Sequence, residues 1–164
     1  MPQIKKTYEY LSELEDALLD MKVLLLKERE DIVNLNLAGL AERKKAIEEL
    51  FGRIRDLHTR TSALIAVACE GAGITKEKTL SSLIGVVPKP DREQFVRLQQ
   101  TIHRISSEID NALKVNSGVL EDSLALANQS LTTFAGMLKN SSTYGQAGRY
   151  VESVDRSRII NREI

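Results

Sequence analysis

The residues of this chain that could carry chemistry are few and far apart. His58 and His103 are its two histidines, and Cys69 is its single cysteine. A metal site would need at least two more converging ligands, and acid–base catalysis would need a group that orients the histidine. No Cys-x-x-Cys, His-Glu-x-x-His or Glu-x-x-His pair accompanies them. Each histidine is one position from an apolar stripe, so both are interpreted as surface residues.

The cysteine and the glycines add no catalytic signature. Cys69 follows Ile65-Ala-Val-Ala near the end of an expected helix, where it is interpreted as a small buried residue. Gly71-Ala-Gly73 follows a helix rather than a strand and lacks the Lys-Ser/Thr of a phosphate loop. We therefore expect no enzymatic activity, no bound metal and no cofactor.

Composition and charge narrow the classes of protein to which the chain could belong. The 164 residues suit one domain with a modest core, and 23 Lys and Arg balance 23 Asp and Glu. A general nucleic-acid binder would carry an excess of positive charge, so nucleic acid is not an expected partner.

The lone cysteine fits a reducing compartment. The start has no apolar signal region, and the longest apolar run, Val23–Leu26, is far too short to span a bilayer. A soluble, cytoplasmic protein without membrane insertion is expected.

The spacing of apolar residues predicts an all-α fold. Good helix formers fill long stretches between the three prolines, and no strand-length alternation is bounded by turn signals. A first helix is expected from about Pro2 to Asn34. Its stripe includes Leu11, Leu14, Leu18, Met21, Leu25, Ile32 and Leu35. Leu19, Val23, Leu24 and Leu26 widen the stripe, so this helix is predicted to contact two neighbours.

A break at Asn34-Leu-Asn36 precedes a second helix, with Asn36 as its N-cap and Gly71 or Gly73 as its stop. In the connector, Thr75 is the expected cap of a short helix that Gly85 ends. Val86–Pro90 is expected to be extended, because a proline disfavours helix in the residue before it. Asp91 and Gln94 then resemble a capping box.

The third helix is predicted to run from Arg92 to Lys139, with a split at Asn116-Ser-Gly as the alternative. Its apolar spacing shifts by one residue after Asn116, as in a stutter. Asn116 falls in the seam between Ile109 and Leu120. It is interpreted as a buried polar residue that sets the register, with a polar fixture in a partner-binding groove as the alternative.

Helix lengths suggest a binding face. At 1.5 Å per residue the third helix would extend about 20 Å past its two partners at its C-terminal end. That part carries Leu131, Phe134, Met137 and Leu138. The face could be ordinary core or a surface that recognises a partner helix, and the extra length favours recognition. Free protein is expected to cover it with its own tail or by dimerising. Residues 1–140 are predicted to form the helical domain and residues 141–164 a flexible tail.

The layout of the chain resembles the FlgN family across almost its whole length. The resemblance rests on a helical hairpin, a Gly/Pro connector and a long helix, together with three motifs: Asn34-Leu-Asn36-Leu-Ala-Gly-Leu, Asn116-x-x-Val119-Leu120 and Tyr144-Gly-x-x-Gly. The helical periodicity along this layout predicts an all-α antiparallel bundle of three long helices with a small connector helix. Val119, where a second Leu is commoner in the family, and Ser117 before the glycine are mild departures.

The resemblance also implies a function. Proteins of this family are flagellar type III export chaperones that bind the C-terminal segments of hook-associated proteins, keep them unassembled and deliver them to the export gate. Tyr144 is the implied contact for the export apparatus. The implied substrate-facing residues are Leu120, Leu124, Leu131, Phe134 and Leu138. The competing interpretation is a coiled-coil scaffold or adaptor that self-associates through the same apolar face.

Overall fold

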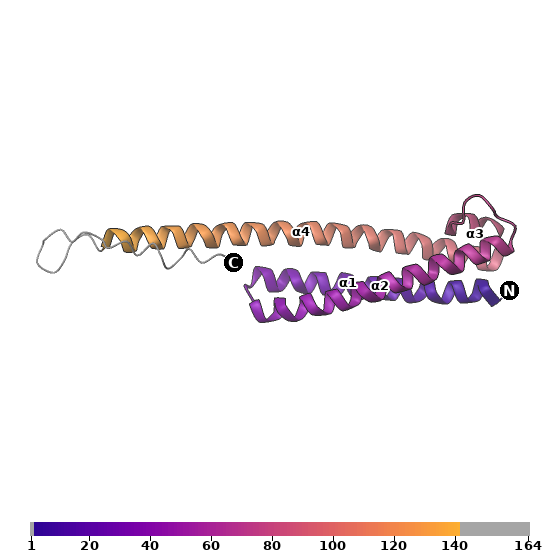
Figure 1. The fold of residues 1–164 in the computed structure, drawn as a ribbon, viewed down its shortest axis with the longest axis horizontal. Coiled ribbons are helices and arrows are strands. Elements are labelled where there is room, and N and C mark those ends of the chain that lie inside the picture. The colour runs from indigo at the N-terminus through magenta and orange to yellow at the C-terminus, as the bar shows by residue number, and fades with distance from the viewer. Residues whose placement is uncertain (1, 142–164) are drawn as a thin grey trace, which may run out of the picture. The chain divides into compact units, whose positions relative to one another are not determined.

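The computed structural model describes the backbone of residues 2–141 and the side chains of residues 3–137. Four helices follow one another in this range: α1 (Pro2–Val33), α2 (Leu37–Gly71), α3 (Leu80–Val86) and α4 (Lys89–Ser141). Figure 1 shows α1 and α2 as an antiparallel hairpin, with α4 returning in the direction of α1. Residues 2–141 contain no strand. The predicted all-α bundle of three long helices with a small connector helix is confirmed.

α1 buries the predicted stripe along one side. Leu11, Leu14, Met21, Leu25 and Ile32 are all buried. The prediction was wrong for Leu19, Val23 and Leu26, which are each more than 40% exposed. At 3.6 residues per turn these three lie roughly 120–180° from Leu14 around the helix, outside the buried stripe. Val23 lines an open groove together with Leu50 of α2. α1 nevertheless contacts both α2 and α4, as predicted, because its buried residues share core clusters with residues of both helices.

The α1–α2 turn has the predicted cap. Asn36 precedes α2, and its side-chain oxygen accepts a hydrogen bond of 3.1 Å from the Gly39 backbone N–H. Leu35 was predicted to belong to the α1 stripe, but it lies in the turn with φ 52° and an exposed side chain. A left-handed residue reverses the chain here, so the apolar periodicity of α1 ends before Leu35.

The connector differs from the prediction at both helix starts. Thr79, not Thr75, caps α3, and its hydroxyl accepts a hydrogen bond of 3.2 Å from the Ser82 backbone N–H. α4 begins at Lys89, so Pro90 lies in its first turn and Asp91 is not the cap. Proline is tolerated there because the first amides of a helix have no partner within the helix. Val87, in extended conformation, separates the two helices.

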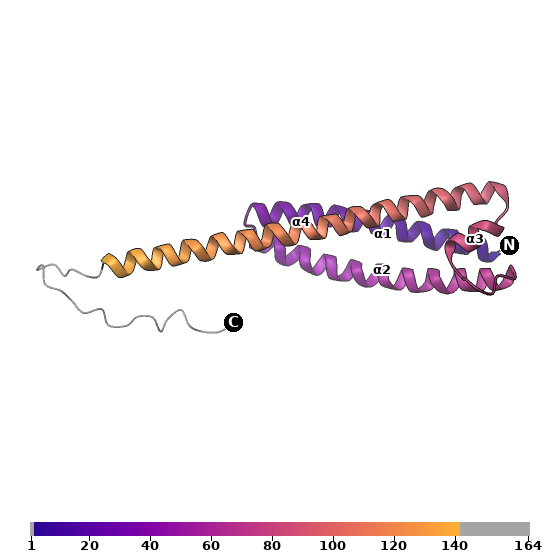
Figure 2. The same cartoon turned by 90° about the horizontal axis from the view of Figure 1, so that it is seen from above.

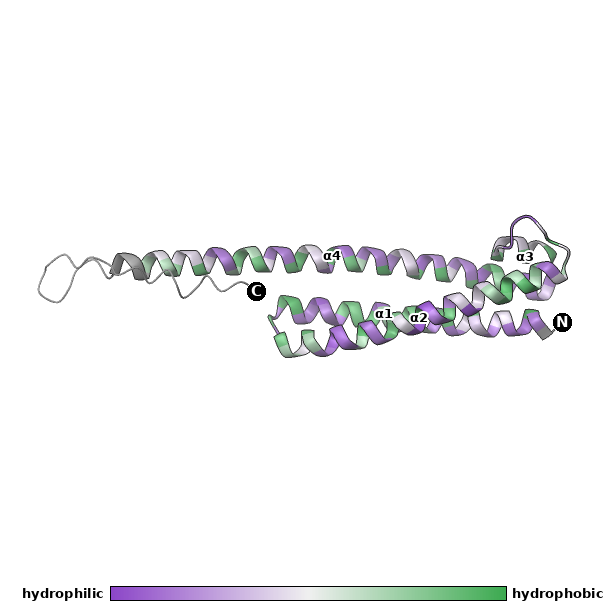
Figure 3. Ribbon diagram, viewed as in Figure 1, coloured by the Kyte–Doolittle hydropathy of each residue, from purple (hydrophilic) through white to green (hydrophobic). Residues whose placement is uncertain are grey.

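The core of the bundle runs along the seam between the three long helices. One end is closed by α3, where Phe95 packs edge-on against Tyr8 with ring centroids 5.6 Å apart. The middle holds Leu14, Ala17 and Leu57, and the other end holds Met21, Leu25, Ile47, Ile105 and Ile109. Figure 2 gives the view from above, and Figure 3 shows apolar and polar residues alternating along each long helix. This alternation is the pattern of amphipathic helices that share one core.

α4 is one continuous helix, so the alternative of two helices split at Asn116-Ser-Gly is wrong. Asn116, Leu120 and Leu124 follow one another at steps of four residues, so they lie on one side of a continuous helix. The shift in apolar spacing after Asn116 therefore requires no break. By its contacts the chain divides into two units, Met1–Leu120 and Glu121–Ile164. The predicted tail from residue 141 lies outside the described residues except for Ser141, which ends α4. Its flexibility stays a prediction.

Candidate protein-binding site

The C-terminal half of α4 carries large apolar side chains in contact with solvent. Leu124 is 56% exposed, Leu131 66% and Phe134 63%, while Leu120 at 42% begins the row. At 3.6 residues per turn these four positions lie within about 80° of one another around the helix. The face predicted from the sequence is therefore one surface, and it is uncovered in the described part of the chain.

Two residues predicted for the site cannot be placed. The side chain of Leu138 and all of Tyr144 lie outside the described residues. Sequence reasoning did not single out Leu126, which is 66% exposed, and it counted Met137 in the apolar region without assigning it to the face. Both lie on α4 beside the predicted row. Their apolar character in a stretch without charged neighbours was the available signal.

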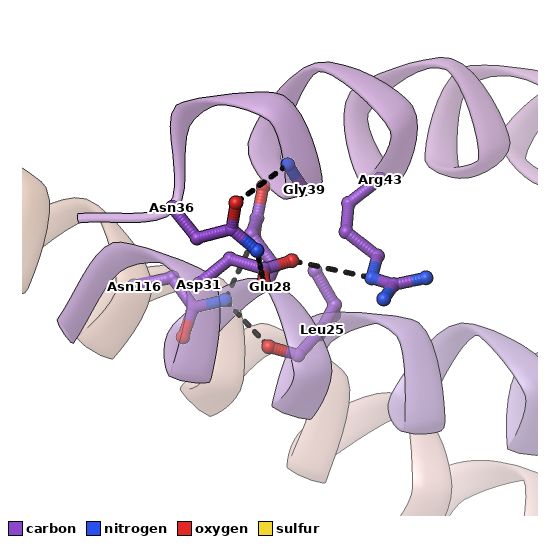
Figure 4. A network of polar contacts seen from close by, with 7 residues as sticks. All are labelled: Leu25, Glu28, Asp31, Asn36, Gly39, Arg43 and Asn116. Carbon is purple, nitrogen blue, oxygen red and sulfur yellow. Dashed lines mark hydrogen bonds and ion pairs between the residues drawn. The ribbon is translucent and has the colours of Figure 1, made fainter. Parts of the chain in front are cut away.

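Asn116 lies in a polar cluster within the bundle, shown in Figure 4. Its side chain is 4% exposed, as its seam position predicted. The Nδ2 group donates to the Leu25 carbonyl at 2.8 Å and to Glu28 Oε2 at 2.7 Å, and Oδ1 accepts from Arg29 Nε at 3.0 Å. Every hydrogen-bonding group of this amide is therefore used, which a buried asparagine needs to avoid destabilising the core.

A second polar cluster joins the end of α1 to the start of α2. Asp31 Oδ1 accepts a hydrogen bond of 2.9 Å from Asn36 Nδ2, and its Oδ2 lies 3.3 Å from Arg43 Nε as an ion pair without hydrogen-bond geometry. Gly39 is buried against the same groups. A Cβ at this position would lie 2.3 Å from Asn36 Nδ2, so only glycine fits without a rearrangement. These contacts hold the turn between α1 and α2 in place.

The residues considered for catalysis are not brought together. His58 and His103 are both exposed, on α2 and α4 respectively. Within residues 2–141 no group of three or more His, Cys, Asp or Glu side chains could hold a metal ion. Cys69 is fully buried, which confirms the structural interpretation of this residue, and burial raises the pKa of its thiol. A thiol with a raised pKa is a poor nucleophile at neutral pH.

Comparison with known proteins decides the family. A family model described as FlgN protein matches residues 1–152. The chain belongs to the FlgN family. Searches among curated proteins and among solved structures returned no match. Membership in the FlgN family gives the chain a general role as a chaperone of flagellar export, and the face on α4 lies inside the matched range.

The FlgN match also bears on whether proteins of this kind are enzymes. The FlgN family is a family of chaperones rather than of enzymes. No helix within the described residues is long and apolar enough to cross a membrane.

Proposed function

We propose that this FlgN-family protein is a cytoplasmic chaperone for the hook-associated proteins at the hook–filament junction. It binds their C-terminal segments, prevents premature assembly and delivers them to the type III export apparatus, without catalysis. The binding surface is the α4 face formed by Leu120, Leu124, Leu131, Phe134 and Leu138. Family membership supports the role, and the exposure of this face supports the site.

The observation that carries the proposal is the row of Leu124, Leu131 and Phe134, each more than half exposed on one side of a helix. Burying a side chain of this size stabilises a complex by about 1.5–3 kcal/mol. An amphipathic helix with apolar residues at matching spacing would cover the row, which is a common mode of recognition between a helix and a groove or face.

The tail has a separate role in this proposal. Tyr144, in the C-terminal tail, contacts the export gate. A chaperone must hold its substrate and present it at the same time, so the two contacts are assigned to different parts of the chain. Substitution of Tyr144 by alanine should reduce export of hook-associated proteins in cells and leave substrate binding by the purified protein unchanged.

The substrate face is tested with Phe134→Asp and Leu131→Asp. Each should weaken binding of a C-terminal peptide of a hook-associated protein at least about tenfold, since each decade corresponds to about 1.4 kcal/mol. Gln129→Asp is the matched control, because it adds the same charge on the opposite side of α4. Isothermal titration calorimetry measures the binding, and urea unfolding measures stability.

Leu57→Asp provides the comparison for stability, because Leu57 is buried in the middle of the bundle. It should unfold the protein, whereas Phe134→Asp should change the unfolding midpoint little. If Phe134→Asp unfolds the protein as severely, the face is core and the proposal is wrong. If Phe134→Asp abolishes self-association and no peptide binds, the coiled-coil scaffold is the correct function.

A further inference from the structure

The exposed part of α4 differs from the rest of the chain in its charge. Charged residues make up 28% of the sequence, yet none occurs between Asp122 and Lys139. This stretch carries exposed Leu124, Leu126, Leu131, Phe134 and Met137. A solvated helix face normally carries many charges, so the composition here is that of a surface that becomes buried.

The polar side chains of this stretch are also suited to burial. Ser130 lies among the apolar residues, and its hydroxyl donates a hydrogen bond of 2.9 Å to the Leu126 carbonyl of the same helix. Thr133 at the margin does the same to the Gln129 carbonyl at 2.9 Å. Donors that are already bonded within the helix can lose contact with water at little cost.

The apolar surface is too wide for one partner helix. Leu124 and Leu126 mark its edges and, at 3.6 residues per turn, lie about 160° apart around the helix. The row of Leu131 and Phe134 and the side chain of Met137 fall between them. A seam between two helices covers a narrower arc, because only two positions in each heptad point at the partner.

The first half of α4 supplies the comparison. Its buried residues, from Ala112 at one edge to Phe95 at the other, span about 100° at the same helical repeat. That narrower arc already packs against two helices, because the core clusters join α4 residues to residues of both α1 and α2. The exposed surface continues this core face along the same helix.

We propose that the partner covers the C-terminal half of α4 with two helices packed side by side, through a contact without charged residues on the α4 side. The inference rests on the proposed function and names the form of the substrate, a pair of amphipathic helices in one hook-associated protein. A second copy of α4 would add only one helix. A membrane surface is disfavoured, because interfacial helices carry Lys or Arg beside their apolar face.

The test compares the two edges of the surface. Leu124→Asp and Leu126→Asp are titrated with a full-length hook-associated protein by isothermal titration calorimetry. Each should weaken binding at least about tenfold, whereas Gln129→Asp should leave it within about twofold. Circular dichroism checks that every variant keeps its helix content.

Salt dependence provides a second readout. Raising NaCl from about 0.1 M to about 1 M shortens the Debye length from about 10 Å to about 3 Å. The dissociation constant should stay within about threefold of its starting value, because no charge on this face takes part. Weakening by about tenfold or more would overturn the assignment of an uncharged contact.

The remaining outcomes separate this inference from the proposed function. If Phe134→Asp weakens binding but only one of the two edge variants does, one helix binds, and the inference fails while the function stands. If none of these variants weakens binding, the proposed substrate face fails as well. A dimer of the chain alone that both edge variants dissociate, seen by analytical ultracentrifugation, would assign the surface to a second copy and overturn the proposal.

Discussion

The side-chain amide of Asn116 donates a hydrogen bond of 2.8 Å to the backbone carbonyl of Leu25, 91 positions earlier in the chain. Arg29 on the same helix as Leu25 donates to the Asn116 oxygen. These two bonds are directional, so they define the position of α4 along the axis of α1. A seam made only of leucine and isoleucine would define that position less strictly.

Asn116→Asp should destabilise the protein by about 2 kcal/mol, because the introduced carboxylate cannot donate to the Leu25 carbonyl and would face the Glu28 carboxylate. Urea unfolding at neutral pH measures the change. Asn128→Asp, at an exposed position of the same helix, should change stability by less than about 0.5 kcal/mol. Equal effects at the two positions would show that the cluster around Asn116 adds no stability.

Gly39→Ala should destabilise the protein by about 1 kcal/mol, since its Cβ would displace the Asn36 and Asp31 side chains and disrupt the cap of α2. Gly52→Ala on the same helix should instead stabilise it by about 0.5–1 kcal/mol, because a Cβ there meets open space. Thermal unfolding distinguishes the two. A stabilising Gly39→Ala would mean that the turn can rearrange freely.

Cys69 should resist thiol reagents in the folded protein. It is fully buried, and burial raises the pKa of its thiol, with nearby Lys78 opposing the change. Its modification by a disulfide reagent at neutral pH should therefore follow the extent of unfolding as urea is added. A cysteine introduced at exposed Ser62 in a Cys69→Ala background should react without urea. Rapid modification of native Cys69 would contradict the burial.

Glu108 should titrate below the usual range for a glutamate. Hydrogen bonds from Lys22 and then Arg104 lower the pKa of its carboxyl. A lowered pKa in the folded state stabilises the protein above the ordinary carboxyl pKa, and this contribution is lost as the pH falls through the lowered value. Lys22→Met should raise the pKa of Glu108, measured by carbon-13 NMR of its carboxyl. Lys44→Met, on α2, should leave it unchanged, and an unchanged pKa in Lys22→Met would contradict the pairing.

The sequence alone predicted helix ends and burial correctly where the apolar periodicity and the capping residues indicated the same structure. The stop of α2 at Gly71 or Gly73, the cap at Asn36 and the burial of Asn116 could all be predicted, because each depends on local backbone chemistry or on heptad position. α2 ends at Gly71, and Gly73 has the positive φ of 77° that favours glycine. Thr79 could not be separated from Thr75 by sequence, since both precede the apolar run and only tertiary packing selects one. The start of α4 was missed because Pro90 was taken as a helix breaker rather than a first-turn residue.

The candidate face was predicted in position but not in width. Spacing identified the row of Leu124, Leu131 and Phe134, whereas Leu126 does not fit a single heptad stripe and was passed over. On α1 the opposite error occurred, because Leu19 and Val23 were assigned to the core and are exposed. Apolar character alone does not state which sides of a helix are packed, so the exposure of Leu126 on α4 and of Leu19 and Val23 on α1 had to come from the structure.

The contacts of α4 have a consequence for how a bound substrate could be sensed. Asn116 bonds to α1 near one end of the bundle, and Arg92 donates to the carbonyls of Ile84 and Gly85 at the other. A slide of α4 by one helical turn, about 5.4 Å, would break all of these bonds together. α4 is therefore anchored against piston-like motion, so a substrate bound at the proposed face would act on the bundle through bending or local ordering of the helix rather than through sliding.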